Sequence, residues 1–204
     1  MTHAHPARAD DDRPPTDYEL LETAVRELLI EKGIVTADEI RAAIEAMDAR
    51  SPAEGARVVA RAWLDADYRR RLLADGRAAV GELGIDIGPT RLVVVENTAR
   101  VHNVIVCTLC SCYPRMLLGL PPDWYKSRAY RARVVAEPRA VLAEFGTVIA
   151  DDVTVRVHDS TADMRYLVLP RRPEGSEGMR EAALAALVTR DAMIGVSVPK
   201  APAA

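Results

Sequence analysis

The sequence has little cysteine, little lysine and no long apolar run, and the first and last of these shortages argue against particular classes of protein. Its three cysteines all lie between positions 107 and 112, and such an odd, clustered set is a poor disulfide framework and favours a metal or redox site. Lysine occurs only at positions 32, 126 and 200, so arginine carries the basic charge, a composition that indicates a GC-rich bacterial genome rather than a function. No apolar run approaches the roughly 20 residues that span a bilayer, which argues against a membrane protein.

Charge and length narrow the classes further. The net charge is −3 and the pI is about 5.9, which gives no electrostatic reason to bind nucleic acid or an anionic membrane. Residues 1–15 lack the apolar stretch of a secretory signal, so we expect a cytoplasmic protein. With 204 residues, of which 49% are hydrophobic, the chain is long enough to bury a core.

The first part of the chain has the pattern of helices. Residues 1–16 are polar and proline-containing and predict a disordered arm. Residues 17–85 are predicted to be helical, because apolar residues recur at helical spacing and Thr36 with Glu39 forms a capping box. The expected helices cover residues 18–32, 36–49, a segment starting at 51, and 66–83.

The second part, residues 86–204, is predicted to be a metal-binding α+β domain. Its β-branched runs are separated from the helices rather than strictly alternating with them, so we expect a layered sheet core covered by helices. The expected strands cover residues 91–95, 104–106, 153–157, 166–169 and 194–198, and a helix is expected over 179–188.

Val106-Cys107-Thr108-Leu109-Cys110-Ser111-Cys112 is the segment that carries chemistry. A zinc site requires a fourth ligand, and neither His102 nor His158 forms a ligand pair in the sequence, so both histidines are interpreted as structural. A [4Fe–4S] cluster also lacks its fourth cysteine, and a thioredoxin-like centre leaves Cys112 without a role.

The spacing of Cys110 and Cys112 permits a different site. If the backbone nitrogens of Ser111 and Cys112 bind as deprotonated amides, they close fused five- or six-membered chelate rings with the sulfurs of Cys110 and Cys112. Cys107 can then reach an axial position and leave a sixth site open. Deprotonating an amide requires a strongly Lewis-acidic ion, which favours trivalent cobalt or iron over zinc. Cys107, Cys110, Ser111 and Cys112 are therefore the predicted metal ligands.

These residues and those that follow them closely resemble the α subunit of nitrile hydratases. The resemblance covers residues 85–199, and Thr108 is similar to the cobalt-type form, since iron-type members have Ser there. The segments that carry it are Cys107 to Pro114, Leu118-Gly119-Leu120-Pro121-Pro122-Asp123-Trp124-Tyr125-Lys126, Tyr130 to Val135, Arg165 to Pro170, Thr189-Arg190-Asp191 and Ile194-Gly195-Val196.

The resemblance implies hydration of a nitrile to its amide at a non-corrin, low-spin Co³⁺ ion that acts as a Lewis acid, with iron the less favoured metal. It implies that Cys110 is oxidised to a sulfinic acid and Cys112 to a sulfenic acid, while Cys107 stays a thiolate. The attacking oxygen comes either from the Cys112 sulfenate, which makes Cys112 the catalytic residue, or from water activated by the metal. It further implies a separate β subunit whose arginines bind the sulfur oxygens, and it leaves room for a metallochaperone.

Two residues beside the cysteines are candidate substrate contacts. Tyr113 resembles a pocket tyrosine of cobalt-type members, with a packed core tyrosine as the alternative. Arg115 stands where the family usually has Trp, and it either lines the pocket or faces the β subunit. In the pocket it would favour a larger polar or heterocyclic nitrile. The alternatives for the whole chain are the metal subunit of a thiocyanate hydrolase and a cobalt-trafficking module.

Overall fold

The computed structural model describes residues 14–110 and 112–200. The chain divides into two compact units, one ending at Ala46 and the other beginning at Met47. The arm predicted for residues 1–16 lies, except for its end, outside the described residues, and the boundary expected near residue 85 stays a prediction. Within the described ranges, no helix combines the length and apolar character needed to cross a bilayer.

The first unit consists of α1 (Asp17–Glu31) and the start of α2 (Ala37–Asp48). Both begin at capping boxes. Thr36 Oγ1 accepts from the Glu39 N–H over 3.1 Å while the Glu39 carboxylate accepts from the Thr36 N–H over 2.8 Å, and Thr16 and Glu19 do the same in α1. No described residue of either helix is buried. Many large apolar side chains of this unit are instead exposed: Tyr18, Leu20, Leu21, Val25, Leu28, Ile34 and Ile44.

The second unit begins with α3 (Ala53–Leu64), α4 (Ala66–Ala74) and α5 (Gly76–Gly81). One helix was predicted over residues 66–83, but the chain forms two. Asp75 takes an extended conformation, and its side chain accepts from the Ala78 N–H over 3.0 Å, so it ends α4 and caps α5.

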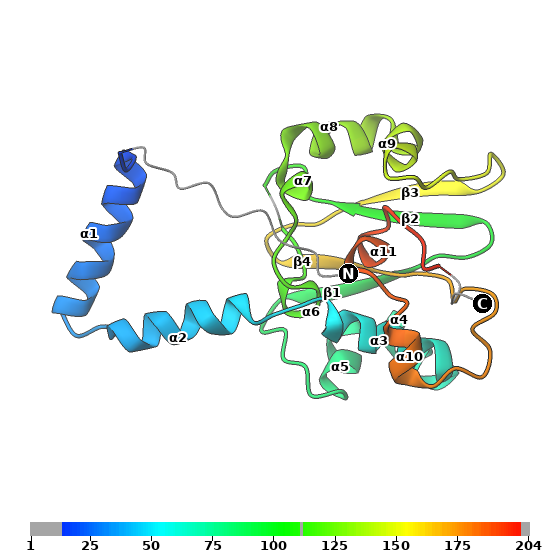
Figure 1. The fold of residues 1–204 in the computed structure, drawn as a ribbon, viewed down its shortest axis with the longest axis horizontal. Helices are drawn as coiled ribbons and strands as arrows, with labels where there is room; N and C mark the ends of the chain where they lie inside the picture. Colours follow the sequence, from blue (N-terminus) through cyan, green and yellow to red (C-terminus); the bar gives the residue numbers. More distant parts are fainter. Residues whose placement is uncertain (1–13, 111, 201–204) are drawn as a thin grey trace, which may run out of the picture. The chain divides into compact units, whose positions relative to one another are not determined.

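The strands form two parallel pairs. β1 (Arg91–Glu96) pairs with β4 (Met164–Leu169), and β2 (Val101–Val106) pairs with β3 (Thr154–Asp159). Helices α4 and α5 pack against β1, and α3 packs against α4 and α10 (Glu181–Ala185) on the same side (Figure 1). Helix α9 (Pro138–Glu144) packs against β3, and α8 (Arg128–Ala136) packs against α9. The α+β class predicted from the sequence is confirmed.

A parallel pair requires a long connection between its strands, and the connection from β2 to β3 carries the cysteines. It contains the loop from Cys107 to Cys112, then α6 (Arg115–Leu118), α7 (Asp123–Lys126), α8 and α9. The cysteines therefore follow directly on the carboxyl end of a buried parallel strand, which is where α/β proteins commonly place ligands.

The strand predicted over residues 194–198 is wrong. Thr189 caps a short helix, α11 (Arg190–Ile194), by accepting from the Ala192 N–H over 3.1 Å. Gly195 then ends this helix with φ 94°, and a Cβ at that position would lie 2.1 Å from the carbonyl oxygen of Asn103. β-Branched residues near position 194 suggested a strand, but the cap and the left-handed glycine form a helical turn packed against β2.

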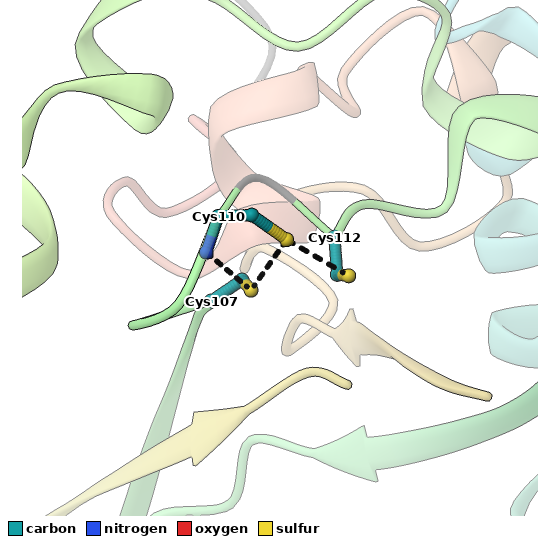
Figure 2. A group of neighbouring side chains, drawn as sticks. All are labelled: Cys107, Cys110 and Cys112. Atoms are coloured by element: carbon teal, nitrogen blue, oxygen red, sulfur yellow. Dashed lines mark hydrogen bonds between the residues drawn. The ribbon is translucent and has the colours of Figure 1, made fainter. Parts of the chain in front are cut away.

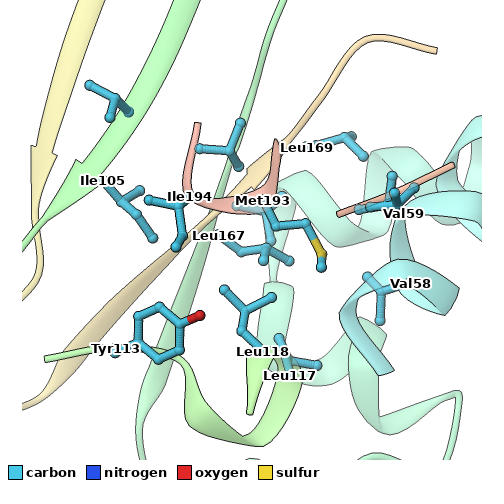
Figure 3. Close-up of a cluster of buried hydrophobic side chains, with 14 of the residues drawn as sticks. Val58, Val59, Ile105, Tyr113, Leu117, Leu118, Leu167, Leu169, Met193 and Ile194 are labelled. Atoms are coloured by element: carbon cyan, nitrogen blue, oxygen red, sulfur yellow. The ribbon is translucent and has the colours of Figure 1, made fainter. Parts of the chain in front are cut away.

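The core lies between α3, the strands, α6 and α11. Figure 3 shows side chains from these elements, and from the loop before α6, meeting in one cluster: Val58, Val59, Ile105, Tyr113, Leu117, Leu118, Leu167, Leu169, Met193 and Ile194. Leu117 and Leu118 are fully buried, so the helix that follows the cysteine loop is anchored in the core.

The two histidines have structural roles, as predicted. His102 is buried and its Nε2 lies 2.7 Å from the carbonyl oxygen of Gly195, while its Nδ1 lies 3.3 Å from Asn97 Nδ2. His158 Nε2 lies 2.8 Å from Asn103 Oδ1. These bonds tie the turn between β1 and β2 to β3 and to the end of α11.

Candidate metal centre

The three cysteines converge at the end of β2. The sulfur of Cys107 lies 3.5 Å from that of Cys110, which lies 3.4 Å from that of Cys112, and all three sulfurs are within 4.8 Å of one another (Figure 2). Cys107 is buried, Cys110 is exposed and Cys112 is half-buried. The group is therefore fixed at its base and open on one side.

The sulfur spacing fits a single transition-metal ion. Thiolates that each lie about 2.3 Å from one ion are about 3.3 Å apart at a right angle and about 3.8 Å apart at a tetrahedral angle. The observed 3.5 and 3.4 Å fall within this range. Among the described residues, this is the cluster of His, Cys, Asp or Glu side chains that could hold a metal. Ser111, whose backbone nitrogen is the fourth predicted ligand, lies outside the described residues, so its role stays a prediction.

Backbone contacts hold the loop in this shape. The Cys110 N–H donates to the Cys107 sulfur over 3.3 Å, and the Tyr125 hydroxyl donates to the Cys112 carbonyl over 3.0 Å. At the base of the loop, the Ser160 N–H donates to the Val106 carbonyl over 2.7 Å, so the pairing with β3 continues to the residue before Cys107.

The thiol of Cys112 is a weak acid in this setting. Burial, together with contact with the sulfurs of Cys110 and Cys107, raises its pKa to about 12, and the charge of Arg165 opposes this rise. A thiol with this pKa is protonated at neutral pH, and only a thiolate binds a metal strongly. Metal loading must therefore release a proton from this residue.

A cavity of about 420 Å³ opens beside the exposed side of the cluster. Cys110, Cys112, Tyr113 and Arg115 all line it, so the structure brings both predicted substrate contacts to the cysteines. Tyr113 is buried, burial raises the pKa of its hydroxyl, and that hydroxyl has no hydrogen-bond partner among the described residues. Arg115 is exposed at the start of α6.

Three further arginines, Arg50, Arg91 and Arg165, line the same cavity, and sequence reasoning missed them. Arg91 begins β1, and Arg165 lies in β4 opposite Leu92. The short turn at residues 97–100 reverses the chain between β1 and β2, so the start of β1 comes near the end of β2. The described residues that line the cavity include four arginines and no carboxylate, so the cavity is positively charged. No spacing in the sequence connects positions 50, 91, 115 and 165.

The fold and the cysteine cluster together define a protein with an open three-sulfur site for a transition metal beside a basic cavity. Comparison with known proteins gives the family. The family model described as "Nitrile hydratase, alpha chain" matches residues 16–197. The chain belongs to the nitrile hydratase α-chain family, a family of hydro-lyases.

Relatives within the family differ in substrate and metal. The chain is 47% identical to the low-molecular-weight cobalt-containing nitrile hydratase subunit α of Rhodococcus rhodochrous over 204 residues, which is 99% of both chains. It is 46% identical to the thiocyanate hydrolase subunit γ of Thiobacillus thioparus over 197 residues, which is 91% of this chain and 81% of that one.

A solved structure adds an iron enzyme to this set. A double mutant of the Fe-type nitrile hydratase of Comamonas testosteroni Ni1 superposes with a TM-score of 0.83 at 43% identity, covering 92% of this chain and 94% of that one. The family is therefore shown, while the substrate and the metal have to be argued from this chain's own residues.

Proposed function

We propose that this chain is the metal-bearing subunit of a nitrile hydratase that converts a nitrile to its amide at a low-spin Co³⁺ centre. The sulfurs of Cys107, Cys110 and Cys112 and the backbone nitrogens of Ser111 and Cys112 would hold the ion. When bound, it would supply Lewis acidity toward the nitrile nitrogen or a water molecule. The observation that carries the proposal is the convergence of the three sulfurs beside an open cavity.

The chain's own residues have distinct roles in this proposal. Cys112, oxidised to a sulfenic acid, lies at the cavity and is the catalytic residue, and Cys110 is oxidised to a sulfinic acid. Buried Tyr113 forms part of the cavity wall, and its hydroxyl is left without a partner by the residues that the structure describes. Arg115 adds a charged, hydrogen-bonding group at the same cavity, which suits a larger polar or heterocyclic nitrile better than a small apolar one.

Cobalt is the metal that this chain's sequence favours. Thr108 follows Cys107 directly, as in the cobalt-type form. The Rhodococcus rhodochrous relative is cobalt-containing and 47% identical over nearly the full chain, whereas the Fe-type structure is 43% identical. Because iron-type relatives have the same fold, Thr108 is a stronger argument for cobalt than the overall similarity is.

A β subunit completes the site in this proposal, and a metallochaperone would deliver the ion. Oxygenated sulfurs are anionic and bind charged hydrogen-bond donors most strongly, and the sequence from Cys107 to Cys112 contains no arginine or lysine. The exposed apolar side chains of α1 support a partner as well: Leu20, Leu21, Val25 and Leu28 are each about half exposed or more in this chain alone. Helices with no buried residue gain little stability from their own unit, so a partner surface would stabilise them.

The test is to produce the chain together with the β subunit of a cobalt-containing nitrile hydratase, in medium with cobalt, and to measure amide formation from aliphatic, aryl and heterocyclic nitriles. The proposal expects turnover by the complex and none by the chain alone. Cobalt binding without turnover of any substrate, even in the complex, would instead support a trafficking module.

One observation favours a second candidate, the metal subunit of a thiocyanate hydrolase. Thiocyanate is a small anion, and Arg50, Arg91, Arg115 and Arg165 give the cavity a positive charge without an opposing carboxylate among its described residues. The relative from Thiobacillus thioparus is named for this activity. Thiocyanate consumption that exceeds nitrile turnover, and that weakens as ionic strength rises, would favour this candidate.

A further inference from the structure

Asp159, the last residue of β3, makes two hydrogen bonds to one residue of the cysteine loop. Its Oδ1 accepts from the Thr108 N–H over 2.9 Å, and its Oδ2 accepts from the Thr108 hydroxyl over 2.6 Å. Both oxygens of the carboxylate are thus engaged with the residue that follows Cys107. Because Asp159 pairs with Val106 in the β2–β3 register, it stands directly across from the point where the loop begins.

Arg131 contacts the other end of the same residue. Its Nη1 donates to the Thr108 carbonyl over 3.4 Å, and it belongs to α8, an element separate from β3. An anion therefore holds the N–H and hydroxyl of Thr108 while a cation holds its carbonyl. Hydrogen bonds with one charged partner are stronger than neutral ones, so the two contacts fix the orientation of this stretch of backbone.

Apolar packing does not hold this part of the loop. Leu109 is 87% exposed, and Thr108 and Cys110 are exposed as well. Between the buried Cys107 and the half-buried Cys112, polar contacts have to set the shape of the turn. The shape of this turn sets the distance of 3.5 Å between the sulfurs of Cys107 and Cys110.

We infer that Asp159 is a positioning residue for the metal centre. With Arg131 it clamps Thr108 and preorganises the sulfurs of Cys107 and Cys110 before the metal arrives. The link to catalysis rests on the proposed function, but the clamp itself is a property of the metal-free chain. A ligand set held in place by its surroundings binds with a smaller ordering cost than one on a free loop.

The first test measures the loop without metal. Hydrogen–deuterium exchange of the segment 107–112 is compared in the metal-free full-length chain, in Asp159→Asn and in Thr108→Val. Asp159→Asn removes the charge and keeps the size, and Thr108→Val removes only the hydroxyl. The matched control is Asp152→Asn, which neutralises an exposed carboxylate on the turn before β3. Asp159→Asn should speed exchange of the segment about tenfold or more, and Thr108→Val by a smaller factor.

The second test connects the clamp to the metal. Cobalt titration into the same metal-free chains, followed by the thiolate-to-cobalt absorption band, should give a shifted band and weaker binding for Asp159→Asn and wild-type values for Asp152→Asn. In the double variant, Thr108→Val should weaken cobalt binding little beyond the effect of Asp159→Asn, because both substitutions break the same contact.

The outcomes separate cleanly. Unchanged exchange and an unchanged band in Asp159→Asn would overturn the inference, and so would equal changes in the Asp152→Asn control. If Asp159→Asn does not fold, the exchange rate of segment 107–112 in Thr108→Val tests the inference, because an exposed hydroxyl can be removed without loss of the fold. Unchanged exchange in that variant would then overturn it. Failure of the proposed function has a different signature: the exchange differences would persist, while the wild-type chain binds no cobalt or its complex with the β subunit turns over no nitrile.

Discussion

The hydroxyl of Tyr125 donates a hydrogen bond to the backbone carbonyl of Cys112 over 3.0 Å. Tyr125 is fully buried beside Tyr113, Trp124 and Tyr130, with its ring centroid 5.0 Å from that of Tyr113. An aromatic core on α7 and α8 therefore reaches the last cysteine of the loop. This contact links the stability of the fold to the shape of the site.

We expect Tyr125→Phe to lower the free energy of unfolding by about 1–2 kcal/mol, because it leaves a partly buried carbonyl without its donor. The ring stays, so the core should remain packed. Urea unfolding of the metal-free chain measures the change, and Tyr18→Phe serves as the control, since Tyr18 is 84% exposed. A loss no larger than that of the control would mean that the bond does not stabilise the loop.

Stability should fall at acidic pH because of His102. Its Nε2 donates to the Gly195 carbonyl, and its Nδ1 accepts from the Asn97 amide. The neutral ring therefore fits this site, whereas a proton added at Nδ1 would point at the N–H group of Asn97. Burial lowers the pKa of His102 from 6.5, although the Gly195 bond opposes this. A lowered folded-state pKa means that the unfolded chain binds the proton first, so stability is present above about pH 6.5 and is lost below it.

His102→Gln should flatten this pH dependence, because an amide does not titrate. Thermal unfolding of both proteins at about pH 5 and about pH 7.5 gives the comparison. His158 shares the lowered pKa, with burial as the main cause, so part of the acid loss should remain in the variant. If His102→Gln loses as much stability at acidic pH as the parent does, other groups cause the loss.

Gly195 should not tolerate a side chain. Its φ of 94° is strained for an L-residue, and a Cβ would lie 2.1 Å from the Asn103 oxygen. We expect Gly195→Ala to destabilise the chain by about 3 kcal/mol or more, measured by urea unfolding. Gly81→Ala is the control, because a Cβ there meets no described atom within 4 Å. Equal stability of the two variants would contradict the close approach of Gly195 to β2.

Helix starts and the site were predictable where the signal is local. The capping box of Thr36 and Glu39 involves residues only three positions apart, and the three cysteines lie within six positions. The structure has both features where the sequence predicts them. The strand expected over residues 194–198 failed because the apolar residues there also suit a buried helical turn. The Thr189 cap and the left-handed Gly195 decided between the two.

Long-range features were beyond local reasoning. The parallel pairing of β2 with β3 joins segments about fifty residues apart, and only that pairing brings Asp159 to Thr108. Arg50, Arg91 and Arg165 likewise share a cavity with Arg115 because of the chain path, not because of any spacing. Residues recruited to a site by tertiary structure leave no pattern in a single sequence.

Arg115 should determine which substrates the cavity accepts. Arg115→Trp replaces a charge with a flat apolar wall, so kcat/KM should rise for small apolar nitriles and fall for polar heterocyclic nitriles or thiocyanate, each by about tenfold. Arg128→Trp is the control, because Arg128 is exposed at the start of α8. If kcat/KM falls equally for all substrates while the complex dissociates, Arg115 belongs to the subunit interface instead.

Oxidation of the cysteines has a mass signature. In the active complex, the peptide that contains Cys110 and Cys112 should carry two added oxygens on the first residue and one on the second. Cys112→Ser should abolish turnover, because it removes both a ligand and the sulfenic acid. Fully active enzyme with unmodified thiols would contradict the role proposed for Cys112.

The central claim is that Cys107, Cys110 and Cys112 together hold one cobalt ion, and elemental analysis tests it most directly. The complex is purified from medium that contains both cobalt and zinc, and its metal content is compared with that of Cys107→Ala and Cys110→Ala. We predict about one cobalt per chain in the parent and loss of cobalt in both variants. Stoichiometric zinc in an active parent, or cobalt retained in both variants, would contradict the claim.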